Sequence, residues 1–347
     1  MRHAHYTVTP AFVRQTAGQA LRQAVPVKDS GASVPARRLI DLLLLVAALR
    51  SSLSAVARRF RFGFSHETAR KAVAANLPGT EALTEGLADA LHRFGGRRLR
   101  KRRWDVAMDL PYCPFYGDKA APGVVGGQKK RGSQYHYADA TAALIHRRHR
   151  YTVGLVPLTD KFKPHEVVAA LLAQLDRHGL RVRGVVLDSG FDAGATLLLL
   201  QGRGLSYTVP LRKKGKGDNR RNACFALPEG TLAEVDWVTE ESRQPVRTQA
   251  VVARRPKDGE VRVYAFGGWG PDEAARARRR AALAKRAYRR RFGIETSYRQ
   301  ANQGKGTTTK KDPAYRLLLF GLALLLRQAW VWLTWQVARA RGLRPSA

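Results

Sequence analysis

Three acidic residues stand where carboxylates can share metal ions: Asp109, Asp188 and Glu295. Asp109 belongs to the alternating stretch WDVAMDLPY and Asp188 ends the run RVRGVVLD, so we expect both on strands of one sheet. The carboxyl ends of neighbouring strands line the crevice where ligands bind, so the acids can converge despite their spacing. Three carboxylates with open coordination positions suit two Mg²⁺ ions, or Mn²⁺, and phosphodiester chemistry. The alternative for each Asp is a turn or helix cap.

Glu295 lies in the stretch YRRRFGIETSYRQANQGKG, which we expect to be helical. At about 100° per residue, a sector of roughly 80° holds five of its side chains. They are Tyr288, Arg291, Glu295, Arg299 and Asn302. A single carboxylate framed by arginines suits a metal ion and a phosphodiester in the same cleft.

The charge balance predicts a polyanionic partner. The chain of 347 residues has 62 Lys and Arg against 27 Asp and Glu, a formal net charge of +35. Nucleic acid is the expected polyanion. An Arg-biased genome or a ribosome-associated protein are the alternatives. The hydrophobic fraction of 44% is enough for packed cores and excludes a disordered basic tail.

The two cysteines, Cys113 and Cys224, have no His or Cys neighbours at metal-ligand spacing, which excludes a zinc finger and fits a reducing compartment. The first residues lack the apolar core of a secretion signal, so we expect a cytoplasmic, nucleoid-associated protein. Residues 317–335 are long enough for a membrane span, but Arg327 and Gln328 fall near the middle. We expect a buried closing helix there, with a membrane-attached protein as the alternative.

Residues 1–100 are expected to form a helical DNA-binding region. The stretches 37–50 and 53–60 are apolar helices, and SHETARKAVAANL opens a third at Ser65. The last two resemble a helix-turn-helix whose second helix carries Arg70 and Lys71 toward a major groove. An ordinary helical pair of a bundle is the alternative. The basic run over residues 95–104 is expected to be a linker.

The fold class that follows is α/β. Strands near residues 104–110, 137–145 and 151–158 form a meander, followed by a helix over 165–178, a strand to Asp188, a helix near 193–200 and the strand SYTVP. This describes a mixed sheet with a crossover unit, the order used by ribonuclease-H-like domains. We assign residues 101–210 and 271–340 to that domain. Residues 211–270 are expected to be a β-rich insertion with strands at TQAVVARR and EVRVYAFGG.

The triad in AMDLPY, VVLDSGF and YRRRFGIETSYRQ resembles the DDE transposases of bacterial and archaeal insertion sequences, of the family four type marked by a Tyr, Arg, Glu and Lys signature. Tyr288, Arg291 and Glu295 match the signature at its spacing. Asn302 stands where the family usually has Lys, which Lys305 or Arg299 would then replace.

The resemblance implies a metal-dependent enzyme that cuts and joins double-stranded DNA at the terminal inverted repeats of a mobile element and in a target, as a dimer in the synaptic complex. Asp109, Asp188 and Glu295 would be metal ligands, while Tyr288 and Arg291 would hold the phosphate backbone. Trp237 and Trp269 are candidates for stacking a displaced base. A catalytically silent DNA-binding derivative is the competing interpretation.

Two further motifs are weaker. The loop GGQKKRG carries Lys129, Lys130 and Arg131, which suit a phosphate backbone or a solvated hairpin tip. His146 and His149 have the spacing of metal ligands, but we expect them to flank a hairpin among arginines that repel a cation.

Overall fold

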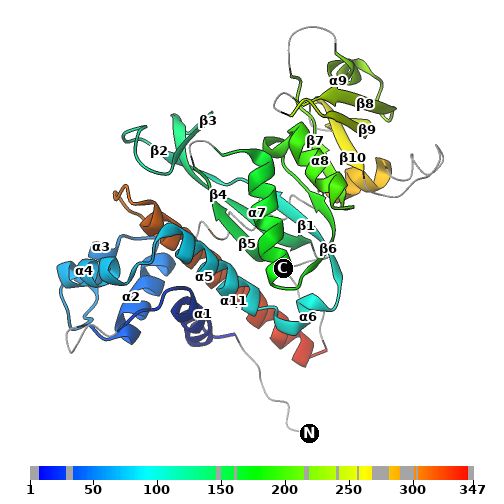
Figure 1. The fold of residues 1–347 in the computed structure, drawn as a ribbon. Coiled ribbons are helices and arrows are strands. Elements are labelled where there is room, and N and C mark those ends of the chain that lie inside the picture. The colour runs from blue at the N-terminus through cyan, green and yellow to red at the C-terminus, as the bar shows by residue number, and fades with distance from the viewer. Residues whose placement is uncertain are drawn as a thin grey trace.

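The computed structural model describes residues 8–28, 34–145, 150–159, 162–214, 219–239, 242–255, 258–267, 281–289, 301 and 304–342. The protein is a mixed α/β structure in which N-terminal helices pack together with one long C-terminal helix beside a mixed sheet (Figure 1).

The N-terminal region is helical, as the sequence predicts. Its elements are α1 (Pro10–Ala24), α2 (Ala36–Ala48), α3 (Leu53–Arg59), α4 (His66–Asn76), α5 (Thr80–Arg93) and α6 (Gly96–Arg100). Ser65 caps α4 by accepting a hydrogen bond from the Thr68 amide at 3.0 Å, which satisfies one of the free amides of the first turn. The basic run expected as a linker contains α6 and the first residues of β1 instead.

Within the described residues the sheet has ten strands. They are β1 (Arg103–Asp109), β2 (Tyr112–Phe115), β3 (Val124–Lys130), β4 (Ser133–Ile145), β5 (Arg150–Pro157), β6 (Arg181–Val186), β7 (Ser206–Pro210), β8 (Leu232–Val238), β9 (Pro245–Arg254) and β10 (Val261–Gly267). The strands β5, β4 and β1 form an antiparallel meander, and β6 and β7 follow β1 in parallel. The helices α7 (Pro164–Arg177) and α8 (Gly194–Gly202) connect β5 to β6 and β6 to β7. The predicted alternation of strands and helices is confirmed.

Residues 211–267 are rich in strands and continue this sheet. The strands β9 and β10 lie where the sequence predicts them, and β8 is an additional strand. Antiparallel pairing of β10 with β7 joins all three to the edge of the sheet. The division of the chain into domains stays a prediction.

Apolar side chains cover both faces of the sheet. Alternate residues of β1 point in opposite directions, so Met108 packs with α7 and α8, whereas Ala107 belongs to the core formed by the N-terminal helices. The core that contains Ala107 and the N-terminal helices also contains residues of α11 (Pro313–Ala340). The N-terminal helices, α11 and one sheet face therefore share a single core.

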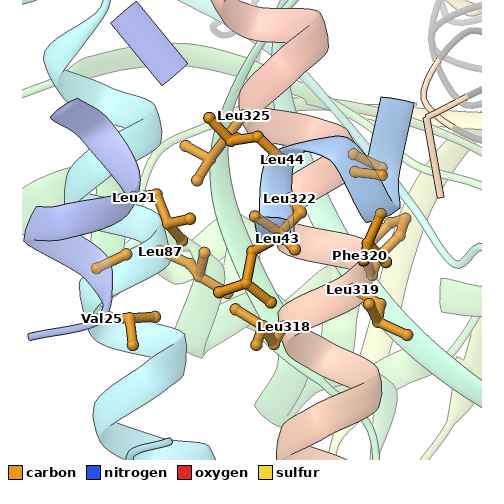
Figure 2. Packing of buried hydrophobic residues seen from close by; sticks show 14 of the residues in the cluster. Leu21, Val25, Leu43, Leu44, Leu87, Leu318, Leu319, Phe320, Leu322 and Leu325 are labelled. Atoms are coloured by element: carbon orange, nitrogen blue, oxygen red, sulfur yellow. The ribbon is translucent and has the colours of Figure 1, made fainter. Parts of the chain in front are cut away.

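Leucines of α11 fill the space between the N-terminal helices. Figure 2 shows side chains of α11 in the core that it shares with α1, α2 and α5, namely Leu318, Leu319, Phe320, Leu322 and Leu325. By length and composition α11 would also suit a membrane, with a mean hydropathy of 1.7, but 67% of its apolar window is buried inside the protein. The pair α2 and α3 passes the same test only as one span bent by 110°. The burial of α11 agrees with the expected closing helix.

Two glycines let helices approach closely in this core. A Cβ atom on Gly86 of α5 would lie 2.5 Å from the carbonyl oxygen of Ala24 in α1. A Cβ atom on Gly321 of α11 would lie 2.5 Å from a methyl group of Leu87. The Gly86 contact is with backbone, which cannot rotate away.

We predict that Gly86→Ala lowers the free energy of unfolding by up to about 2 kcal/mol, because overpacking costs about 1–3 kcal/mol and the gain in helix propensity returns about 1 kcal/mol. Gly202→Ala in α8 is the matched control, since nothing lies within 4 Å of its added methyl group. Urea denaturation of both variants measures the difference. Equal stability of the two variants would contradict the close packing of α1 on α5.

Candidate functional site

Asp109 and Asp188 lie side by side at the carboxyl ends of two parallel strands. Ala107 of β1 pairs with Val186 of β6, so two further residues in the same register set Asp109 next to Asp188. Neighbouring strands lie about 4.8 Å apart. Asp109 is 7% exposed. This register brings together the two strand ends that carry these acids, and their role in one site with Glu295 stays a prediction.

Each of the two carboxylates also makes a local hydrogen bond. Asp109 accepts from the Leu110 amide at 3.0 Å, and Asp188 accepts from the Ser189 amide at 2.8 Å. Asp188 thereby caps a short 3-10 turn, which is the alternative role that the sequence analysis considered for this residue. An ionised carboxylate has about four lone-pair sites, so one such bond is compatible with metal ligation.

Tyr112 of β2 lies within electrostatic reach of both acids. Burial raises the pKa of the Tyr112 hydroxyl, the negative charges of Asp188 and Asp109 raise it further, and Arg212 lowers it. Arg212 follows β7 at the same edge of the sheet. The sequence analysis did not select Tyr112 or Arg212; the basic residues directly after the strand SYTVP were the available signal for Arg212.

Asp139 of β4 is a third acid near this edge that the sequence analysis did not select. Thr141 pairs with Asp109, so Asp139, two residues away on β4, lies on the same sheet face. Its carboxyl group is enclosed by the surrounding chain, although the residue as a whole is partly exposed. Burial raises the pKa of this carboxyl group to about 6, and the positive charge of Lys305 acts in the opposite direction. The predicted DNA contact Lys305 therefore lies within electrostatic reach of this acid.

The helix expected to carry Tyr288 and Glu295 is only partly described. Residues 281–289 are helical, and the Tyr288 ring is 4% exposed and lies 4.7 Å from the ring of Tyr264 in β10. Tyr288 shares a buried cluster with Val186, two residues before Asp188. The ring thus packs against the sheet, and its contact with phosphate stays a prediction. Glu295, Arg291, Arg299, Asn302 and Trp269 lie outside the described residues, as do His146 and His149.

The basic loop at residues 126–132 is a hairpin tip. The strand β3 turns into β4 through Arg131 and Gly132, which have φ angles of +49° and +87°. Lys130 pairs with Ser133, and positive φ at both central residues is typical of a tight hairpin turn. Lys129, Lys130 and Arg131 are exposed, and the ammonium group of Lys130 lies 4.7 Å from the centre of the Tyr112 ring. The tip is thereby linked to the edge that carries the acids.

In the expected recognition helix α4, Arg70 forms an ion pair with Glu67 at 2.9 Å. Burial raises the pKa of the Tyr315 hydroxyl in α11, and the positive charge of Arg70 opposes this rise. Lys71 is exposed. Their contact with DNA stays a prediction.

A buried ion pair lies four residues past Asp188. Asp192 accepts a hydrogen bond from the Arg221 guanidinium, and both side chains are almost fully buried. The Arg221 guanidinium lies 5.1 Å from the centre of the Trp237 ring. Arg221 and Trp237 line a cavity of about 460 Å³ between the starts of α7 and α8 and the strand β8. Trp237 therefore borders a cavity, and base stacking by it stays a prediction.

The donor set suits a hard cation, since carboxylate oxygens are the ligands that Mg²⁺ prefers. Within the described ranges no group of three or more His, Cys, Asp or Glu residues is arranged to hold a metal ion. Asp109 and Asp188 would hold a metal together with a further ligand.

No family model matches the sequence, and no curated protein matches it. Among solved structures, the chain is similar to one in the cryo-EM structure of a piggyBac transposase synaptic complex with hairpin DNA. The identity is 12% and the TM-score 0.49, with 100% of this chain and 70% of that chain covered. A likeness at this level does not assign a family.

We predict that Asp139→Asn stabilises the protein more at pH 8 than at pH 4.5, measured by thermal unfolding with a chelator present. The folded pKa of about 6 exceeds the ordinary 3.8, so folding favours the protonated acid and stability is lost as pH rises from about 4 through 6. The neutral amide removes this loss, which amounts to about 3 kcal/mol. Asp118→Asn on the exposed loop after β2 is the control. Equal gains at both pH values would show that the Asp139 carboxyl group is solvated.

Proposed function

We propose that this protein is a DDE-type DNA transposase, which cleaves DNA strands at the ends of a mobile element and transfers them to a target. The carrying observation is the register of β1 and β6, which sets Asp109 beside Asp188 at the carboxyl edge of a mixed sheet. The formal charge of +35 supports DNA as the partner, and the protein would act in the cytoplasm at the nucleoid.

A ribonuclease-H-like assignment for the catalytic domain is part of the proposal. The order β5, β4, β1, β6 and β7, with three antiparallel strands followed by two parallel ones, supports it. The strands β8 to β10 would be an insertion that lengthens the sheet.

Glu295 is the proposed third metal ligand. Described residues on both sides of it lie near this sheet. Tyr288, seven residues before Glu295, packs near the end of β6, and Lys305, ten residues after it, acts on the pKa of Asp139. The segment between them therefore joins two elements that flank the sheet face carrying Asp109.

Two Mg²⁺ ions, when bound, would activate the attacking oxygen and stabilise the leaving oxygen of the phosphodiester. The chain supplies the rest of the chemistry. Asp109 and Asp188, with Glu295, would hold the metals on a rigid sheet edge. Arg212 and Lys305 would place positive charge beside the scissile phosphate, while Arg70, Lys71 and residues 129–131 would contact the backbone farther away. A dimer is proposed for the complex that joins two element ends.

A catalytically silent DNA-binding protein is the competing function. Such a protein would need the cationic surface but not the paired acids. The side-by-side placement of Asp109 and Asp188 favours the enzyme, because an unneeded pair of like charges at one edge raises the cost of folding.

We predict that Asp109→Ala and Asp188→Ala each reduce Mg²⁺-dependent cleavage at least about a hundredfold, because each removes a metal ligand and with it a few kcal/mol of charge stabilisation. The assay uses DNA fragments that flank the coding region, with binding followed separately by gel shift. DNA affinity should stay within about twofold of the unmodified protein.

Asp105→Ala is the control for this experiment. Asp105 lies on β1 as well, but pairs with Arg183 at 2.5 Å near the opposite end of the strand. It should leave cleavage intact. If the unmodified protein binds DNA but neither it nor Asp105→Ala cleaves, the silent DNA-binding protein becomes the preferred function; near-normal cleavage by Asp109→Ala would refute the assignment of the site.

A further inference from the structure

Residues 112–137 form a projection from the catalytic sheet that we name the arm. It contains β2, β3 and the first part of β4, and both β2 and β3 pair with β4. In Figure 1 it extends away from α7 and α8. The sequence analysis selected only the charges at its tip.

Two tyrosines on the arm are exposed although they are large and aromatic. Tyr116 is 71% exposed and Tyr135 is 37% exposed. Both line a shallow groove of about 460 Å³, together with Lys129, Ser133 and Gln134. We name this the arm groove. It combines two aromatic rings, a cation and hydrogen-bonding groups on one small surface.

The chain holds the groove in shape. The Tyr116 hydroxyl donates to the carbonyl oxygen of Arg131 at 2.7 Å, which ties the ring to the hairpin turn. Ser133 donates to the carbonyl oxygen of Phe115 at 2.5 Å and accepts from the Tyr135 amide at 3.0 Å. A Cβ atom on Gly117 would lie 2.5 Å from the Phe115 ring, so only glycine fits beside this ring without a shift.

The arm groove lies within a short reach of the acids. Tyr112, the first residue of β2, follows Asp109 at the end of β1 by three residues. Tyr116 follows four residues later, which corresponds to about 13 Å of extended chain. A strand of DNA held at the acids can therefore also reach the groove.

The chemistry of the groove selects among nucleic acids. Duplex DNA presents phosphates to a surface, and cations alone are sufficient to bind them. Exposed aromatic rings beside a cation are instead the feature of surfaces on which unpaired bases stack. A groove of this volume has room for one or two bases rather than for a duplex.

We infer that the arm groove binds unpaired bases of single-stranded DNA next to the cleavage point, with Tyr116 and Tyr135 as the stacking residues and Lys129 on the backbone. The inference rests on the proposed function for the identity of the polymer. It assigns to the arm a task separate from metal binding: it holds the strand that loses its partner at the cut end.

The test compares binding of a 20-nucleotide oligothymidylate and of a 20-base-pair duplex by fluorescence anisotropy, in the full chain with a chelator present. Tyr116→Ala and Tyr135→Ala should each weaken single-strand binding about 5- to 100-fold, the range measured for loss of one stacked base. Duplex binding should change less than about twofold. Tyr116→Phe and Tyr135→Phe are the matched controls: they keep the rings and should bind the single strand as the unmodified protein does.

Lys129→Ala separates charge from stacking. It should weaken binding of both DNAs and make the salt dependence shallower, whereas the tyrosine variants should leave that slope unchanged. An unfolding temperature equal to that of the unmodified protein would establish that the variants are folded.

Three results would overturn the inference: alanine variants that bind the single strand normally, a parallel loss for the duplex, or Tyr116→Phe losing as much as Tyr116→Ala. The last result would mean that the bond to Arg131 shapes the tip and that the ring stacks on nothing. A protein that binds neither DNA would refute the proposed function and this inference together. Cleavage that depends on Asp109, combined with unaltered binding by the tyrosine variants, would refute the inference alone.

Discussion

The burial of α11 between the N-terminal helices and the sheet is the interaction on which the other parts depend. The segment that precedes α11 is fixed at the N-terminal region, where the Thr307 amide donates to the Ser51 carbonyl at 3.0 Å. The same segment holds the base of the arm, since the Tyr137 hydroxyl donates to the Lys311 carbonyl at 2.8 Å. Arg316 then lies over the Tyr137 ring at 4.3 Å. Loss of the α11 contacts would therefore displace Lys305 and the arm together.

The proposed site consists of acidic residues in a protein with a large net positive charge. Asp109 and Asp188 carry like charges at one edge of the sheet, and the surrounding positive charge lowers the cost of their repulsion. Arg212 lowers the pKa of the Tyr112 hydroxyl and Lys305 lowers that of the Asp139 carboxyl, each against the larger effect of burial. A divalent metal requires negatively charged ligands, whereas DNA requires positive charge on the protein surface. A narrow acidic edge within a basic surface provides both.

Local pattern predicted much of the fold and part of the site. Alternation in WDVAMDLPY and the apolar run before Asp188 were enough to predict two strands that end in acids. Alternation of apolar and polar residues is the local pattern of a strand with one buried face, and a short apolar run is the pattern of a buried strand. The strands β2 and β3 were missed, since Pro114 and two consecutive glycines, Gly126 and Gly127, weaken the strand pattern. Asp139 and Tyr112 were missed for another reason: their proximity to the acids arises from pairing between strands, which no local window contains. The shared core of the N-terminal helices and α11 is likewise a contact between distant segments.

That shared core has a consequence for synthesis of the protein. Leu43 and Leu44 of α2 pack with Leu318 and its neighbours of α11, more than 260 residues later in the chain. At about 5 to 20 residues per second, the ribosome needs on the order of 15 to 50 s to supply the partner. During this interval the leucines of α2 lack the side chains that cover them in the folded protein. A chain that ends before α11 would keep this apolar surface exposed, and exposed apolar surface of this kind promotes aggregation.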